Sequence, residues 1–208
     1  ERSRELAGIT LAEWRDLDFR LVWGMFTRWG SIIFGLLESV FLAGCAAPSS
    51  ESSKPPLELA EYVDLERFMG RWYVHGYTPT MIDAYAFNAT ETYEMGKNGR
   101  ILTTYRFNAN STYGLEKVYN PSARIENTTT NAEWRMRFFG LINAAYLIIY
   151  VSDDYEYTVI GHPDRNLAWV MSRNPAIDEK RYTTLREELE RRSFDLSKFR
   201  RVEHRTGP

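Results

Sequence analysis

Hydrophobic and polar residues alternate over most of the chain from residue 70 onward. Short segments rich in β-branched and aromatic residues follow one another, and turn residues separate them at fairly regular spacing. This pattern is typical of an antiparallel sandwich or barrel. It predicts eight strands, over residues 70–78, 87–95, 100–108, 113–120, 132–139, 144–151, 155–161 and 167–173.

Short turns join most of these segments. Lys97-Asn98-Gly99 and Ser152-Asp153-Asp154 have hairpin-turn compositions, and residues 139–143 and 162–166 form longer connections. Because short links favour pairing between successive strands, we expect an up-and-down meander. Eight such strands can close into an all-β antiparallel barrel with room for one small ligand.

Alternation also assigns side chains to the two faces of each strand. Arg135 and Arg137 should face water, which turns their neighbours inward, and Tyr155 and Val159 should point inward in the strand at 155–161. The segment 144–151 is apolar on both faces, so its orientation stays open. The inward-facing, ligand-binding side chains predicted in this way are Tyr105, Phe107, Trp134, Met136, Phe138, Tyr157, Trp169 and Met171.

The spacing of apolar residues changes after the last strand. Tyr182, Leu185 and Leu189 recur every three or four residues and form one apolar stripe between about residues 178 and 192. Asp178 suits an N-cap position, and the acidic Glu179 suits the first turn. We therefore expect one C-terminal α-helix packed on the outside of the barrel.

The segment before the strands has the features of an export signal. Residues 25–44 combine a basic start, a short apolar stretch and small residues ahead of Cys45. The apolar stretch is shorter than the ~20 residues of a membrane-spanning helix, which makes a transmembrane helix the weaker interpretation. We interpret 25–44 as a signal peptide, 1–24 as an upstream extension, and 45–61 as a flexible tether.

Composition and motifs narrow the class of function. The net charge of −2, without a long basic run, gives no reason to expect a nucleic-acid partner. The three histidines, His75, His162 and His204, are not at metal-ligand spacing, and the sequence has no serine-nucleophile elbow or phosphate-binding glycine loop. We expect no catalytic residues, no metal and no cofactor.

Two separated motifs carry a family resemblance. Gly70-Arg71-Trp72-Tyr73 resembles the motif that opens the first strand of lipocalins, and the run from Asp154 to Arg173 resembles their later motifs. The resemblance covers about residues 62–204, and we assign 62–208 to a lipocalin domain. In that family the residues corresponding to Trp72 and Arg173 form a structural cation–π pair at the closed end of the barrel.

The residues around Cys45 are similar to a second known pattern. Leu42-Ala43-Gly44-Cys45 resembles the lipobox of bacterial lipoproteins, whose cysteine is acylated and becomes the first residue of the mature protein. Ala46 is not the aspartate that retains such proteins at the inner membrane. The resemblance therefore implies a lipid anchor at Cys45 in the outer membrane, with the barrel in the periplasm.

The family resemblance also implies a ligand and leaves alternatives open. Bacterial lipocalins suggest a fatty acid or lysophospholipid held in the barrel cavity, in a role of storage or transport for membrane maintenance. The alternatives are an interaction lipoprotein whose barrel is filled, and a carrier of haem or a retinoid-like pigment. Some lipocalins form homodimers, but no interface pattern is visible in this sequence.

Overall fold

A computed structural model describes residues 55–205 of the chain. The predicted extension, signal peptide and acylated Cys45 lie outside these described residues. Two α-helices and a short 3-10 helix, η2 (Lys97–Gly99), are present in the described part, and none of them is long and apolar enough to cross a membrane.

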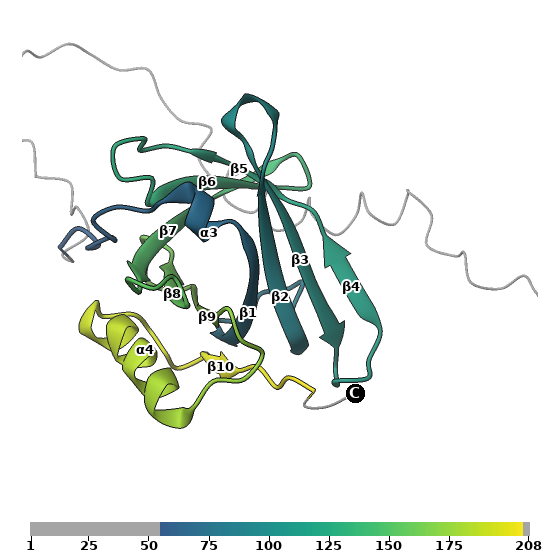
Figure 1. Cartoon of the computed structure of the whole chain (residues 1–208). Coiled ribbons are helices and arrows are strands. Elements are labelled where there is room, and N and C mark those ends of the chain that lie inside the picture. Colours follow the sequence, from purple (N-terminus) through teal and green to yellow (C-terminus); the bar gives the residue numbers. More distant parts are fainter. Residues whose placement is uncertain (1–54, 206–208) are drawn as a thin grey trace, which may run out of the picture. The chain divides into compact units, whose positions relative to one another are not determined.

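Antiparallel strands form a closed barrel in this part of the chain (Figure 1). Apart from the fourth and fifth, successive strands are hydrogen-bonded to one another. The first strand pairs with the ninth as well as with the second, which closes the sheet into a barrel. The eight-stranded up-and-down barrel is therefore confirmed. The strands are β1 (Gly70–Tyr77), β2 (Ala86–Met95), β3 (Ile101–Ala109), β4 (Glu116–Tyr119), β5 (Ser122–Ile125), β6 (Glu133–Phe138), β7 (Ile142–Val151), β8 (Tyr157–Gly161) and β9 (Ala168–Ser172).

The fourth position in the barrel differs from the prediction of one strand over 113–120. It is occupied by two short strands, because both β4 and β5 pair with β3, at different places along its length. Pro121 lies between them and has no N–H to donate to a ladder, so the strand is interrupted there. Its carbonyl oxygen still accepts a 3.0 Å hydrogen bond from the Thr103 N–H, which keeps the two halves in line.

A further short strand, β10 (Arg200–Arg201), was not predicted. It pairs with the second half of β1, where β2 no longer does, and brings the C-terminal segment against the barrel wall. Two residues are too few for a period-two pattern, so the sequence gives no signal for it.

The helix predicted over 178–192 is present as α4 (Glu179–Arg191). The Asp178 carboxylate caps its first turn by accepting a 2.9 Å hydrogen bond from the Arg181 N–H. Tyr182, Leu185 and Leu189 are its buried residues, and they pack on the outer face of β8 and β9 (Figure 1). Hydrophobic burial on one stripe therefore holds this helix, as the spacing indicates.

A cluster of buried side chains lies between α4 and the outer face of the barrel, and it corrects the predicted orientation of side chains in β8. Tyr157 and Val159 belong to this cluster, whereas Ile160 points into the barrel. Tyr157 and Val159 were predicted to face inward by counting alternate residues from Tyr155. That count fails because Tyr155 has a left-handed backbone (φ 61°) in the turn before β8, and a turn residue does not preserve the alternation of a strand.

The structure also orients the strand that the sequence left open. Tyr146 and Ile148 of β7 point into the barrel, while Ile149 points outward to the cluster beneath α4. The pairing with β8 shifts its register between Ile148 and Tyr150, which marks a β-bulge. Both faces of β7 are therefore buried, which explains its continuous apolar sequence.

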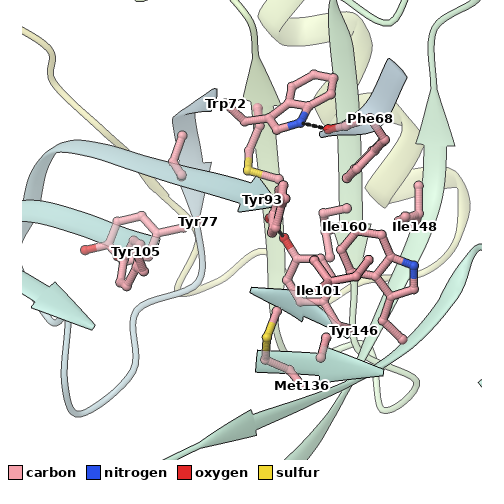
Figure 2. Close-up of a cluster of buried hydrophobic side chains, with 14 of the residues drawn as sticks. Phe68, Trp72, Tyr77, Tyr93, Ile101, Tyr105, Met136, Tyr146, Ile148 and Ile160 are labelled. Atoms are coloured by element: carbon pink, nitrogen blue, oxygen red, sulfur yellow. Dashed lines mark hydrogen bonds between the residues drawn. The ribbon is translucent and has the colours of Figure 1, made fainter. Parts of the chain in front are cut away.

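A short helix, α3 (Leu65–Phe68), closes one end of the barrel. Figure 2 shows the Trp72 indole N–H directed at the Phe68 carbonyl oxygen, 2.9 Å away. The Arg173 guanidinium lies 3.8 Å from the centre of the Trp72 ring and donates hydrogen bonds to the carbonyl oxygens of Arg67, Phe68 and Arg71. This is the arrangement that the family resemblance implies.

Gly70 is needed at this closed end. Its φ of +92° is unfavourable for any residue with a side chain, and an added Cβ would lie 3.4 Å from the Arg173 Nη1 atom. The glycine therefore lets the backbone turn from α3 into β1 directly beneath the arginine.

Residues 55–61, which composition assigns to the tether, lie along the barrel. The Ala60 N–H donates a 3.0 Å hydrogen bond to the Ile148 carbonyl, and Arg165 donates one of 2.6 Å to the carbonyl of Pro55. Leu57 and Leu59 pack against the buried clusters. The folded unit thus begins before residue 62.

We expect Arg173→Met to lower the free energy of unfolding by about 2–4 kcal/mol. The variant keeps an unbranched side chain but removes the cation over Trp72 and the hydrogen bonds that Arg173 donates to three backbone carbonyls. Urea unfolding would measure the loss. Arg124→Met is the control, since that arginine forms an ion pair with its side chain 67% exposed, and its loss should stay below about 1 kcal/mol. Equal losses in the two variants would contradict the structural role of Arg173.

Candidate functional site

The barrel encloses a cavity of about 380 Å³. This volume lies in the range of small-molecule binding pockets, about 300–1,000 Å³. The cavity reaches the loops that join β1 to β2, β6 to β7 and β8 to β9. Since antiparallel strands reverse direction at each turn, these three loops lie at one end of the barrel, opposite α3. We call this end the mouth.

The predicted ligand-binding residues divide into three groups. Tyr105, Met136, Phe138 and Trp169 line the cavity. Phe107, Trp134 and Met171 are buried inside the barrel but are not among the cavity-lining residues. Tyr157 lies outside the barrel, with the Arg181 guanidinium 4.7 Å from its ring centre, and so does not face the cavity.

Packed aromatic side chains fill the half of the barrel next to α3. Phe68 lies 5.1 Å from Trp72 and 5.4 Å from Trp134, measured between ring centres. Tyr93 packs 5.7 Å from Phe68, and Figure 2 shows it between the closed end and Tyr146. The hollow part of the barrel is therefore confined to the half nearer the mouth.

Glu91 is a cavity-lining residue that the sequence analysis missed. It lies on β2 between Ala89 and Tyr93, which also point inward, and only 6% of its surface is exposed. The sequence contains an indication of this, because Glu91 lies two residues from Ala89 and two from Tyr93, and alternate residues of a strand point to the same face. Its charge and the flanking threonines indicate an exposed position instead, which is the usual location of glutamate.

Two tyrosines hydrogen-bond to the buried carboxyl group of Glu91. Tyr146 donates a 2.9 Å hydrogen bond to its Oε2 atom, and the Tyr93 hydroxyl donates to the same oxygen. Burial raises the pKa of Glu91 because it disfavours the charged form, while the two hydrogen bonds act in the opposite direction and are the smaller effect. Burial also raises the pKa of both tyrosines well above the ordinary value, so they remain donors.

A second carboxylate, Asp83, holds the β1–β2 loop at the mouth. Its Oδ1 atom accepts hydrogen bonds of 2.7 Å from the Thr80 N–H and 2.6 Å from the Thr80 hydroxyl. Tyr105 donates a 3.1 Å hydrogen bond to Oδ2, and Tyr77 donates one of 2.6 Å to the Asp83 carbonyl oxygen. These bonds tie the loop to the barrel wall.

The mouth has an apolar border. Met81 is fully exposed, Phe139 is 62% exposed and Ile142 is 59% exposed, and all three also line the cavity. Leu141, at the tip of the β6–β7 turn, is exposed as well. Among the described residues that line the cavity, only His162 carries a basic side chain. The site is thus an apolar hollow with two carboxyl groups and an apolar entrance.

A closed antiparallel barrel around such a cavity defines a protein that binds a lipophilic ligand in its interior. The chain belongs to the lipocalin-like domain family, whose model matches residues 63–204. Proteins of this family generally bind ligands and are not enzymes.

Named relatives show the same relationship at low sequence identity. The temperature-induced lipocalin-1 of Arabidopsis thaliana is 22% identical over 165 residues, which cover 76% of this chain and 88% of that protein. The outer membrane lipoprotein Blc of Escherichia coli (strain K12) is 24% identical over 160 residues, covering 76% of this chain and 87% of Blc. Both alignments include most of the relative's length.

The fold is also that of solved lipocalin structures. Insecticyanin from the tobacco hornworm Manduca sexta superposes with a TM-score of 0.56 at 19% identity, over 72% of this chain and 85% of insecticyanin. Lobster apocrustacyanin A1 superposes with a TM-score of 0.55 at 13% identity, over 68% and 79% of the two chains. These matches establish the barrel architecture and not the ligand.

We expect Glu91→Gln to raise the free energy of unfolding near neutral pH. Since burial raises the pKa of Glu91, the folded protein holds a proton at pH values where the unfolded chain, with a glutamate pKa of about 4.3, has released it. Stability from this group is therefore present below about pH 4.3 and is lost as the pH rises through the raised pKa. Glutamine does not ionise, so the variant does not lose this stability as the pH rises.

Urea unfolding at about pH 4 and about pH 8 would test this, and the advantage of the glutamine variant should grow with pH. Glu94→Gln, at an exposed position on the same strand, is the control and should show no such growth. A stability difference between parent and Glu91→Gln that does not change with pH would contradict the expectation.

Proposed function

We propose that this protein is an outer-membrane-anchored carrier that stores or transports fatty acids or lysophospholipids for membrane maintenance. The observation that carries the proposal is the enclosed, mostly apolar cavity of about 380 Å³ that opens at an apolar mouth. An open cavity disfavours the alternative of a filled barrel that acts only through its outer surface.

Burial of one hydrocarbon chain supplies the binding energy in this proposal. Each methylene removed from water contributes about 0.8 kcal/mol, so about eight methylenes contribute roughly 6 kcal/mol before the costs of ordering and association. The aromatic and thioether surfaces of Phe138, Trp169 and Met136 provide the apolar walls.

The charges at the site favour one orientation for an anionic lipid. Glu91 and Asp83 both line the cavity, and no lysine or arginine is among the described lining residues. Inside the cavity a carboxylate or phosphate head group would find no lysine or arginine among these described residues to pair with and would lose its hydration. The head group therefore stays at the mouth in water while the chain enters the barrel.

The anchoring part of the proposal rests on Cys45 and on the relatives. Leu42-Ala43-Gly44-Cys45 has the lipobox pattern, and relatives from several bacteria are named outer membrane lipoproteins. The exposed apolar residues at the mouth suit the exchange of a chain with a nearby membrane.

Substitutions in the cavity should abolish lipid uptake. Trp169→Glu or Phe138→Glu places a charge in the apolar hollow, and Ala144→Phe fills it without adding charge. Each should weaken binding of a fluorescent fatty acid by at least about tenfold. Native mass spectrometry should show a co-purified acyl ligand in the parent and none in these variants.

Tyr113→Glu is the control for these variants, because Tyr113 is largely exposed and does not line the cavity. It should bind as the parent does. Parental affinity in both Ala144→Phe and Trp169→Glu would refute the cavity as the ligand site. A parent that purifies with visible absorbance and no acyl chain would favour a pigment carrier.

Replacement of Cys45 should release the protein from the membrane. In a Gram-negative host, the parent should incorporate labelled palmitate and fractionate with the outer membrane, whereas Cys45→Ser should do neither, because the acyl chains provide the anchor. Ala46→Asp is a matched control that should keep the label and move the protein to the inner membrane. Palmitate incorporation by Cys45→Ser would contradict the assignment.

A further inference from the structure

The deep end of the cavity has a polar surface that a simple hydrocarbon chain would not satisfy. In the strand registers, Glu91 lies opposite Trp72 of β1 and Tyr105 of β3. Trp72 belongs to the closed end, so Glu91 is located where the hollow meets the packed aromatic half of the barrel. A chain that enters from the mouth therefore reaches Glu91 with its far end.

One oxygen of Glu91 is open to this cavity. Both hydrogen bonds given to the carboxyl group, from Tyr93 and Tyr146, end on Oε2. No described residue donates to Oε1. Every fully buried side-chain nitrogen or oxygen of the described residues has a partner, so the unpaired Oε1 atom must be accessible from the hollow that Glu91 lines.

The chemistry of this oxygen restricts the ligand group beside it. A methyl end would leave Oε1 without water and without a hydrogen-bond partner, which opposes binding. A carboxylate would face a carboxyl group in a place where the described lining residues include no lysine or arginine. An ammonium group would have to lose a much larger hydration energy than a neutral group.

A hydroxyl group avoids each of these costs. It can donate a hydrogen bond to Oε1 when Glu91 is ionised, and it can accept one when Glu91 is protonated. Burial raises the pKa of Glu91 and so favours its protonated form. A hydroxyl group can pair with both the protonated and the ionised carboxyl group.

We propose that Oε1 of Glu91 forms a hydroxyl subsite at the deep end of the cavity, so that the preferred ligand is a single hydrocarbon chain with a hydroxyl group at its buried end. This inference rests on the proposed lipid-binding function and narrows its ligand class. A hydroxylated fatty acid and a long-chain alcohol that enters hydroxyl-first share this chemistry.

Displacement of a fluorescent fatty acid would test the subsite with chain-matched competitors. Dodecanoic acid and ω-hydroxydodecanoic acid differ only in the terminal hydroxyl, and dodecanol has the hydroxyl without the carboxylate. In the parent, the ω-hydroxy acid should displace the probe at about tenfold lower concentration than dodecanoic acid. An entirely apolar pocket would give the opposite order, because the hydroxyl would lose its hydration without compensation.

Variants at Glu91 link the preference to this residue. Glu91→Leu should reduce the ratio between the two acids to one or below, and it should weaken dodecanol by a similar factor. Glu91→Gln keeps an oxygen and a donor at the same place and should retain most of the preference. Thr103→Val is the matched control, since Thr103 also lines the cavity and carries a hydroxyl, and the preference should persist there.

The outcomes separate this inference from the proposed function. If dodecanoic acid binds the parent as well as or better than the ω-hydroxy acid, or if Glu91→Leu leaves dodecanol binding unchanged, the hydroxyl subsite is refuted while lipid binding stands. If none of the three chains displaces the probe, and the probe itself does not bind, the proposed function fails. Near-UV circular dichroism of each variant verifies that the barrel is folded.

Discussion

The hydrogen-bonded pairing of β1 with β9 is the interaction on which the rest of the structure depends. It joins the first and last strands of the meander, from Tyr73 opposite Ser172 to Tyr77 opposite Trp169, and so closes the sheet into a barrel. Without this closure the inward side chains would face water on one side, and no enclosed volume would exist. The bulge between Val74 and Gly76 adds the local twist that a closed barrel requires.

A closed barrel can be filled by its own side chains or can enclose a cavity. In this barrel one half is filled and the other is hollow, because the large side chains are concentrated at one end. Large rings gather at the end that α3 covers, where Phe68, Trp72 and Trp134 are fully buried. Smaller side chains, including Thr80 and Ala144, line the half towards the mouth. The aromatic half supplies the hydrophobic stabilisation of a close-packed interior, which lets the other half remain hollow at little cost to stability.

The carboxyl groups in the hollow are the main polar exception to this apolar interior. Asp83 is explained by structure, since its hydrogen bonds from Thr80 and Tyr105 hold the loop at the mouth. Glu91 holds no loop, and its two tyrosine donors satisfy only one of its oxygens. Burying a carboxyl group that could be replaced by an apolar residue opposes folding. A residue placed in this way is better explained by what enters the cavity than by the stability of the barrel.

The sequence by itself determined the barrel, the outer helix and much of the inward face. Strand alternation and the stripe of Tyr182, Leu185 and Leu189 indicate which side chains are buried. This information lies in the spacing of residues within a single element. Tertiary structure decided which buried residues border the cavity, because empty volume depends on the distance between strands remote in sequence. It also placed Tyr157 outside, where the left-handed Tyr155 resets the alternation, and turned Glu91 inward beside Tyr146, a partner 55 residues away. Such contacts are properties of the closed barrel, and no short window of sequence contains them.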